Sequence, residues 1–111
     1  MGARNGLSGS LAIVGIGETE YVRRSERDVK SLIIDAVMRA LDDAGISPGE
    51  VDGIITEGMM TPNYFLADDL AEQMGFSLRY NATFSSIAPG MAYTPLMAAM
   101  AIREGLADVI V

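Results

Sequence analysis

The 111-residue sequence contains no cysteine and no histidine. Without cysteine, these residues form no disulfide and supply no thiolate nucleophile. Without histidine, they lack the usual general base and the imidazole ligands of a zinc site. Thiol catalysis, a Ser-His pair and a Cys/His metal cluster are therefore excluded within this stretch. We predict no bound metal and no cofactor.

Positive charge is also scarce. Eight Lys and Arg residues stand against 15 Asp and Glu residues, which gives a formal net charge of -7. A nucleic-acid-binding domain normally carries a basic stripe, and an anionic membrane surface attracts basic segments. Neither pattern occurs, so we expect no nucleic-acid partner and no membrane surface.

Long apolar runs are missing as well. The stretch 91–106 comes nearest to a membrane span, but Arg103 and Glu104 interrupt it. Residues 1–10 are rich in Gly, Ser and Asn, and they indicate a flexible arm rather than a signal peptide. We therefore expect a cytoplasmic protein with a single domain over residues 11–111.

Short apolar runs alternate with helical patterns along the first half of the chain. Residues 11–16 (LAIVGI) are typical of a strand that is buried on both faces. Residues 26–44 repeat apolar positions at helical spacing, behind a Ser25-x-x-Asp28 pattern that resembles a capping box. Gly45 stands where a left-handed C-cap belongs, so the helix is predicted to end at Ala44.

The alternation continues in the second half. Residues 51–56 (VDGIIT) predict a second strand and residues 80–84 a third. Between them, Thr61 and Pro62 form an N-cap followed by a proline at the first helical position, and Gly75 closes that helix.

Residues 90–106 are apolar nearly all round, which is typical of a buried helix. Pro95 lies inside this stretch, where a proline costs about 3 kcal/mol. The hydrogen-bond part of that cost vanishes if the helix starts at Ala92 or later, with Thr94 as the N-cap in the limiting case. Residues 108–111 (DVIV) then begin a last buried strand.

The predicted order is therefore β-α-β-α-β-α-β, an α/β fold with a mainly parallel sheet and helices on both faces. Because the chain stops inside a buried-type strand, we predict that it is truncated at Val111. Residues 108–111 would then form an open sheet edge, and the apolar helix would lack its cover. We expect a partner for both, either in a homo-oligomer or as the missing C-terminal half.

Three segments resemble the N-terminal half of the thiolase superfamily, and most closely its lipid-transfer-protein branch. They are LAIVGIGETEY (11–21), DDAGISPGEVDGIITEG (42–58) and AMAIREGLADVIV (99–111). The most specific parts are the ending I-x-x-G-L-A-D-V-I-V and the run G-x-G-x-T-x-Y. The resemblance extends from Leu11 to Val111 and implies the first half of a thiolase-like domain.

That resemblance implies a reactive cysteine at the start of the buried helix, where the helix N-terminus favours a thiolate. The matching stretch is SSIAPG (85–90), and the cysteine position falls on Ile87 or Ala88, depending on a one-residue gap. Neither side chain can act as a nucleophile. Ser85 and Ser86 are secondary candidates, but a serine nucleophile needs an adjacent base, and capping or turn hydrogen bonds suit them better.

Substrate contact is assigned to Met59, Met60 and Thr61, which follow the second strand. The loops beyond the carboxyl ends of parallel strands line the ligand crevice of such sheets. Gly15 and Gly17 follow the first strand, but the full G-x-G-x-x-G pattern of a dinucleotide site is absent. A tight turn is predicted there instead.

Two other sets of residues are interpreted as structural. The acidic pairs Asp42-Asp43 and Asp68-Asp69 are predicted to be solvated, because adjacent residues on a helix point in different directions. Methionines at helical spacing are either a soft ligand-facing surface or core filler, and core filler is the favoured reading. They are Met91, Met97 and Met100.

The resemblance implies a parent enzyme that makes or breaks a carbon–carbon bond in acyl-CoA thioesters. Because the cysteine is absent, retro-aldol cleavage beside a small OB-fold partner subunit is expected in preference to thiolysis. Coenzyme A would enter as part of the substrate. The residues that catalyse this cleavage would lie beyond Val111, so the 111 residues alone are predicted to be inactive. The alternative is a non-catalytic interaction subunit with a thiolase-like fold.

Overall fold

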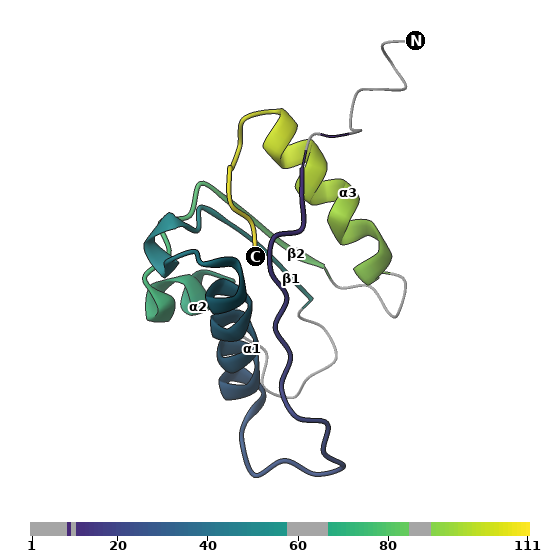
Figure 1. Cartoon of the computed structure of the whole chain (residues 1–111), viewed down its shortest axis with the longest axis vertical. Coiled ribbons are helices and arrows are strands. Elements are labelled where there is room, and N and C mark those ends of the chain that lie inside the picture. The colour runs from purple at the N-terminus through teal and green to yellow at the C-terminus, as the bar shows by residue number, and fades with distance from the viewer. Residues whose placement is uncertain (1–8, 10, 58–66, 85–89) are drawn as a thin grey trace.

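The computed structural model describes residues 9, 11–57, 67–84 and 90–111 (Figure 1). Three helices and two strands alternate along these residues, with a short 3-10 turn before the first strand. In chain order they are α1 (Val29–Ala44), η2 (Pro48–Glu50), β1 (Gly53–Glu57), α2 (Ala67–Met74), β2 (Tyr80–Phe84) and α3 (Gly90–Arg103).

The centre of the sheet is β1. On one side it pairs in parallel with β2, in a register that runs from Gly53 opposite Tyr80 to Glu57 opposite Phe84. On its other side it pairs in parallel with residues 109–111. In this pairing, the backbone N–H of Ile55 donates to the carbonyl of Val111 at 2.9 Å. The strands predicted at 51–56, 80–84 and 108–111 therefore pair in parallel, as expected.

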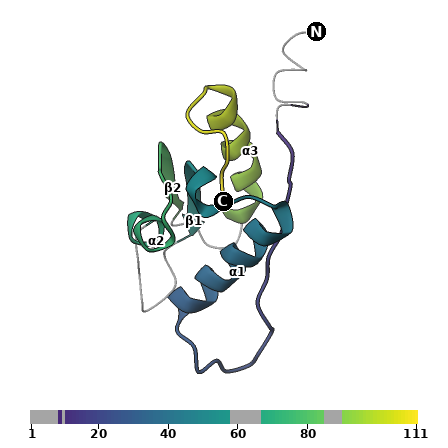
Figure 2. The same cartoon turned by 60° about the vertical axis from the view of Figure 1, so that its left-hand side comes forward.

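Helices cover both faces of this sheet, as the sequence predicted (Figures 1 and 2). On one face, Ile54 of β1 is buried in a core that it shares with Leu41 of α1 and Leu70 of α2. On the other face, α3 packs on β1, and its buried residues are Ala99 and Ala101. The small alanine side chains allow the helix to approach the sheet closely.

Local capping sets the ends of α1. The backbone N–H of Ser31 donates to the Asp28 carboxylate at 2.7 Å, so Asp28 is the N-cap. Gly45 takes the left-handed conformation (φ 70°) that was predicted for the C-cap. The helix begins at Val29 instead of Glu26, because the Ser25 hydroxyl accepts the N–H of Arg27 and forms a local turn before the helix.

The first predicted strand, residues 11–16, does not form a strand in this structure. Both edges of β1 are already occupied, by β2 and by residues 109–111, so no edge of the central strand remains for it. We call residues 11–22 the strap, since they run extended alongside α1 (Figures 1 and 2). Its side chains Ile13, Val14 and Ile16 are 78%, 62% and 74% exposed.

The last helix does not start late enough to spare the hydrogen bond at Pro95. It begins at Gly90, so Pro95 lies beyond the first four N–H groups and removes one internal hydrogen bond. Tyr93, Leu96 and Met100 are about half exposed, as expected for an apolar helix that lacks its cover. No helix in the described part of the chain is long and apolar enough to span a bilayer.

The second helix is described from Ala67 onward, and residues 61–66 lie outside the described residues. It ends at Met74, and Gly75 takes the positive φ of 76° that a helix-ending glycine favours. The predicted end of this helix is therefore confirmed, and its predicted start at Thr61 and Pro62 stays a prediction.

The buried position of Ala99 generates the first testable prediction. Its side chain is 4% exposed, so a larger side chain would overpack its surroundings. We expect Ala99→Leu to lower the free energy of unfolding by about 1–3 kcal/mol, measured by urea denaturation. Met100→Leu is the matched control, because Met100 faces outward, and equal stability of the two variants would contradict the layer assignment.

Candidate functional site

The two strands β1 and β2 end side by side, with Glu57 opposite Phe84. In open α/β sheets, ligands bind in the crevice outside the carboxyl ends of the strands. The segments that leave this edge, 58–66 and 85–89, carry every site residue that the sequence predicted. All of these lie outside the described residues: Met59, Met60, Thr61, Ser85, Ser86, Ile87 and Ala88. Their roles stay predictions.

Two threonines form a hydroxyl pair next to this edge. The Oγ1 atoms of Thr56 on β1 and Thr83 on β2 lie 3.1 Å apart, and one of them donates to the other. Both stand on the sheet face that also carries Ile54, since side chains alternate along a strand. This hydrogen bond joins β1 and β2 near their carboxyl ends, and it places two hydroxyl groups close to this edge.

A second polar contact fixes α2 to the sheet. The side-chain amide of Asn81 donates to the Asp68 carboxylate at 2.8 Å. Asp68 is exposed, as predicted, and its hydrogen bond to Asn81 was not predicted. Sequence spacing on α2 carries no sign of the contact, because the amide comes from a strand that follows the helix.

No metal site appears in the part of the chain that the structure describes. There, no three or more acidic side chains gather in a way that could hold an ion. The described edge therefore has no set of metal ligands. What the edge provides is a fixed frame, with two strand ends in register and α3 beginning at Gly90.

An apolar groove of about 210 Å³ lies at the opposite end of the strands. It is lined by Tyr80, Met97, Met100, Ala101, Glu104 and Leu106. Tyr80 is the first residue of β2, so the groove lies at the amino end of the strand and away from the predicted crevice. Met100 is 53% exposed, so the reading as core filler is wrong for this methionine, whereas Met97 is half-buried. The side chain of Met91 lies outside the described residues.

The Asp52 carboxylate anchors the last sheet segment. It accepts the backbone N–H groups of Asp108 (2.9 Å) and Val109 (2.8 Å). Arg79 adds a guanidinium contact to Asp52 at 3.4 Å and donates to the Gly105 carbonyl at 2.8 Å. Sequence reasoning missed this cluster. An Asp directly before a strand is a weak signal. The two backbone N–H groups that it binds, those of Asp108 and Val109, lie more than 50 positions away.

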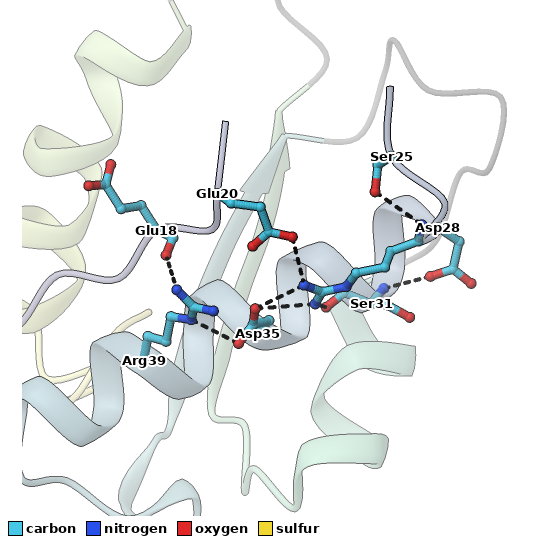
Figure 3. A network of polar contacts seen from close by, with 8 residues as sticks. Glu18, Glu20, Ser25, Asp28, Ser31, Asp35 and Arg39 are labelled. Atoms are coloured by element: carbon cyan, nitrogen blue, oxygen red, sulfur yellow. Dashed lines mark hydrogen bonds and ion pairs between the residues drawn. The ribbon is translucent and has the colours of Figure 1, made fainter. Parts of the chain in front are cut away.

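A polar network joins the strap to α1 (Figure 3). The Asp35 carboxylate accepts a hydrogen bond from Arg39 Nε at 2.9 Å. It also accepts hydrogen bonds from both Nη atoms of Arg27 at 3.2 Å. Arg39 donates to the Glu18 carbonyl at 3.1 Å, and Arg27 reaches the Glu20 carboxylate at 3.3 Å. The hydrogen bond from Arg39 is the main cause that holds the pKa of Asp35 below its usual value.

A further contact joins the strap to α1. The backbone N–H of Ile16 donates to the Asp43 carboxylate at 3.0 Å. Asp42 and Asp43 are both exposed, as predicted, and Asp43 also holds the strap through this hydrogen bond. The sequence pattern of α1 does not reveal this role, because it depends on where the strap lies.

The Asp52 anchor yields a second prediction. Asp52→Ala would leave the N–H groups of Asp108 and Val109 without their acceptor, and an unsatisfied donor costs about 1–3 kcal/mol. We expect faster hydrogen exchange at these two amides together with a loss of stability of that order. Asp108→Asn is the control, because its side chain is 82% exposed. Unchanged exchange in Asp52→Ala would show that the segment holds its place without the carboxylate.

No protein-family model matches the chain. The chain is 40% identical over 108 residues to the 17-hydroxy-3-oxo-4-pregnene-20-carboxyl-CoA lyase of Mycobacterium tuberculosis. That match covers 95% of this chain and 27% of the lyase. The chain therefore spans about a quarter of the length of this curated relative.

Solved structures share the fold. A structure described as the Ltp2-ChsH2(DUF35) aldolase superposes with a TM-score of 0.79 and 33% identity, over 89% of this chain and 25% of that one. A monomeric SCP2-thiolase like protein from Mycobacterium smegmatis gives a TM-score of 0.67 at 20% identity, over 88% of this chain and 21% of that one. These likenesses confirm the α/β fold and the thiolase-like resemblance.

Proposed function

We propose that this thiolase-like chain belongs to an enzyme that cleaves a carbon–carbon bond in an acyl-CoA thioester by a retro-aldol reaction. The observation that carries the proposal is the 40% identity to a carboxyl-CoA lyase over 95% of the chain. An aldolase that superposes on the chain at a TM-score of 0.79 supports the same reaction class.

The retro-aldol reaction suits a chain without cysteine. A base removes the proton from a β-hydroxyl group, the bond between Cα and Cβ breaks, and its electron pair passes into the thioester as an enolate. The oxygen leaves as a ketone or aldehyde, and the enolate is then protonated. No acyl group is transferred to the protein, so the Ile87 or Ala88 found at the cysteine position is compatible with this chemistry.

The described residues would contribute the frame of such a site. The strand ends at Glu57 and Phe84 are held in register, and the Thr56–Thr83 pair joins them. We propose that Met59, Met60 and Thr61 contact the substrate from the segment that follows β1. As the resemblance implies, we propose that the base and the donors that stabilise the enolate come from other parts of the parent protein.

We also propose that the enzyme works with a partner subunit of the small OB-fold type. The support is the name of the superposed aldolase, which joins two components, Ltp2 and ChsH2(DUF35). Contact with a second copy of the chain or with a further segment of a thiolase-like protein is proposed for α3. Its outward residues Tyr93, Leu96 and Met100 are about half exposed.

The second candidate function is a non-catalytic interaction subunit. It is favoured by the same exposed side chains of α3. In this case the thiolase-like fold would only support a partner. Activity of the complete protein separates the two candidates.

The third prediction concerns covalent chemistry. We expect no acyl adduct when the 111-residue chain is incubated with an acyl-CoA, because the cysteine position carries Ile87 or Ala88. Intact-mass spectrometry measures this directly, and a thiolase with its cysteine serves as the positive control. A stoichiometric adduct on Ser85 or Ser86 would overturn the proposal.

The fourth prediction separates the two bond-breaking reactions. Thiolysis consumes free coenzyme A, whereas retro-aldol cleavage does not. A protein that carries this chain within a complete thiolase-like fold should cleave a β-hydroxyacyl-CoA without added coenzyme A. The same protein should leave a β-ketoacyl-CoA intact when free coenzyme A is supplied. Chromatography of the CoA products reports both results, and the opposite pattern would establish thiolysis.

A further inference from the structure

The turn after α3 is held to the amino ends of the two strands by Asp52 and Arg79. One Nη atom of Arg79 donates to the Gly105 carbonyl at 2.8 Å, and the other donates to the Asp52 carboxylate at 3.4 Å. Asp52 also accepts the backbone N–H groups of Asp108 and Val109. We propose that Arg79 is a positioning residue, which sets the place of α3 along its own axis by holding Gly105. This role rests on the proposed function, because the start of α3 would border the retro-aldol site.

The shape of the Arg79 side chain suits this task. Gly105 ends α3 in the left-handed conformation (φ 73°), and its carbonyl lies on one side of the guanidinium, with Asp52 on the other. A guanidinium presents its donors in a rigid plane, so it fixes two acceptors relative to each other in a way that an ammonium group does not. The side chain is 55% exposed, and exposed ion pairs add little stability. Its main contribution is therefore to geometry.

The surface between α3 and the sheet gives little resistance to sliding. Among the described side chains of α3, 93–103, the buried ones are Ala99 and Ala101. Large side chains form ridges that interlock with a neighbouring element and fix a helix along its axis. Alanine side chains form only shallow ridges, and helix shifts of about 1–2 Å occur at packed interfaces. The place of α3 along its axis therefore depends on what holds its ends.

The other end of α3 lies at the predicted site. Strand β2 ends at Phe84 on the carboxyl edge of the sheet, and α3 begins at Gly90. The helix has 14 residues, so its start lies about 21 Å from the contact between Arg79 and Gly105. A shift along the axis at one end of a helix moves the other end with it. Misplacement by about 1 Å can slow an enzymatic reaction about a hundredfold, so this distant contact bears on the chemistry.

Spin labels can measure the position of α3, because the chain has no native cysteine. Tyr93→Cys places one label in the first turn of α3, before Pro95, at a position that is 55% exposed. Glu72→Cys places the other label on an exposed position of α2, which is bonded to the sheet through Asn81. The distance between the two labels therefore reports where the start of α3 lies relative to the sheet.

Arg79→Gln is the test variant in this doubly labelled 111-residue chain. Its matched control is Arg103→Gln, which removes the same charge from the last turn of α3 and leaves the Arg79 contacts in place. We expect Arg79→Gln to shift or broaden the distance by about 1–2 Å, and Arg103→Gln to match the parent distribution. If circular dichroism shows that Arg79→Gln does not fold, Arg79→Lys is measured in its place, since lysine keeps the charge without the planar fork. A distance equal to that of Arg103→Gln would overturn the positioning role.

The effect on catalysis is measured in a protein that carries this chain within a complete thiolase-like fold. We expect Arg79→Gln to lower kcat about tenfold, with KM within about twofold, because the helix start bears on the reacting groups. Gly45→Ala is the control for stability, because it strains the left-handed C-cap of α1 far from α3, and it should keep kcat.

An equal loss of kcat in Arg79→Gln and Gly45→Ala would show that Arg79 acts through stability alone, and would overturn the positioning role. Absence of cleavage in the unsubstituted protein would contradict the proposed function instead. The distance between the labels needs no activity, so it would still decide whether Arg79 sets the position of α3.

Discussion

The pairing of β1 on both of its edges is the constraint on which the rest of the structure depends. Hydrogen bonds join it to β2 on one side and to residues 109–111 on the other. This central position buries Val51 and Ile54 completely, and it gives α1 and α2 one face and α3 the other. Gly53 allows the close pairing, because a Cβ there would lie 2.7 Å from the Ile110 side chain.

The strap lies next to this sheet without joining it. Residues 11–16 stay extended outside the sheet, and glycines bring their backbone onto α1. The result is an apolar segment held mainly by polar contacts. Such a segment responds to salt and to single charges in a way that a paired strand does not.

Sequence patterns predicted those features of the fold that depend on residues close together in the chain. The Gly45 C-cap, the strand 80–84 and the parallel order follow from local rules of capping, composition and alternation. Contacts between distant segments escaped prediction. Asp52 anchors Val109, Asp43 holds Ile16 and Asp68 binds Asn81, and each aspartate looks like an ordinary surface acid in the sequence. The predicted site residues lie outside the described residues and remain predictions.

The described residues position the predicted site, but they do not include an identified catalytic group. Its described residues supply strand ends in register, a hydroxyl pair and a close-packed helix, but neither a histidine nor a metal-ligand cluster. A retro-aldol step needs a base near the β-hydroxyl group and donors near the thioester oxygen, both held to within a fraction of an ångström. In the proposed enzyme, those groups would come from other parts of the parent protein. The half-exposed apolar side chains of α3 would offer such a part a surface on which to dock. The pairing of β1 on both of its edges would then fix the strand ends against which the catalytic groups are placed.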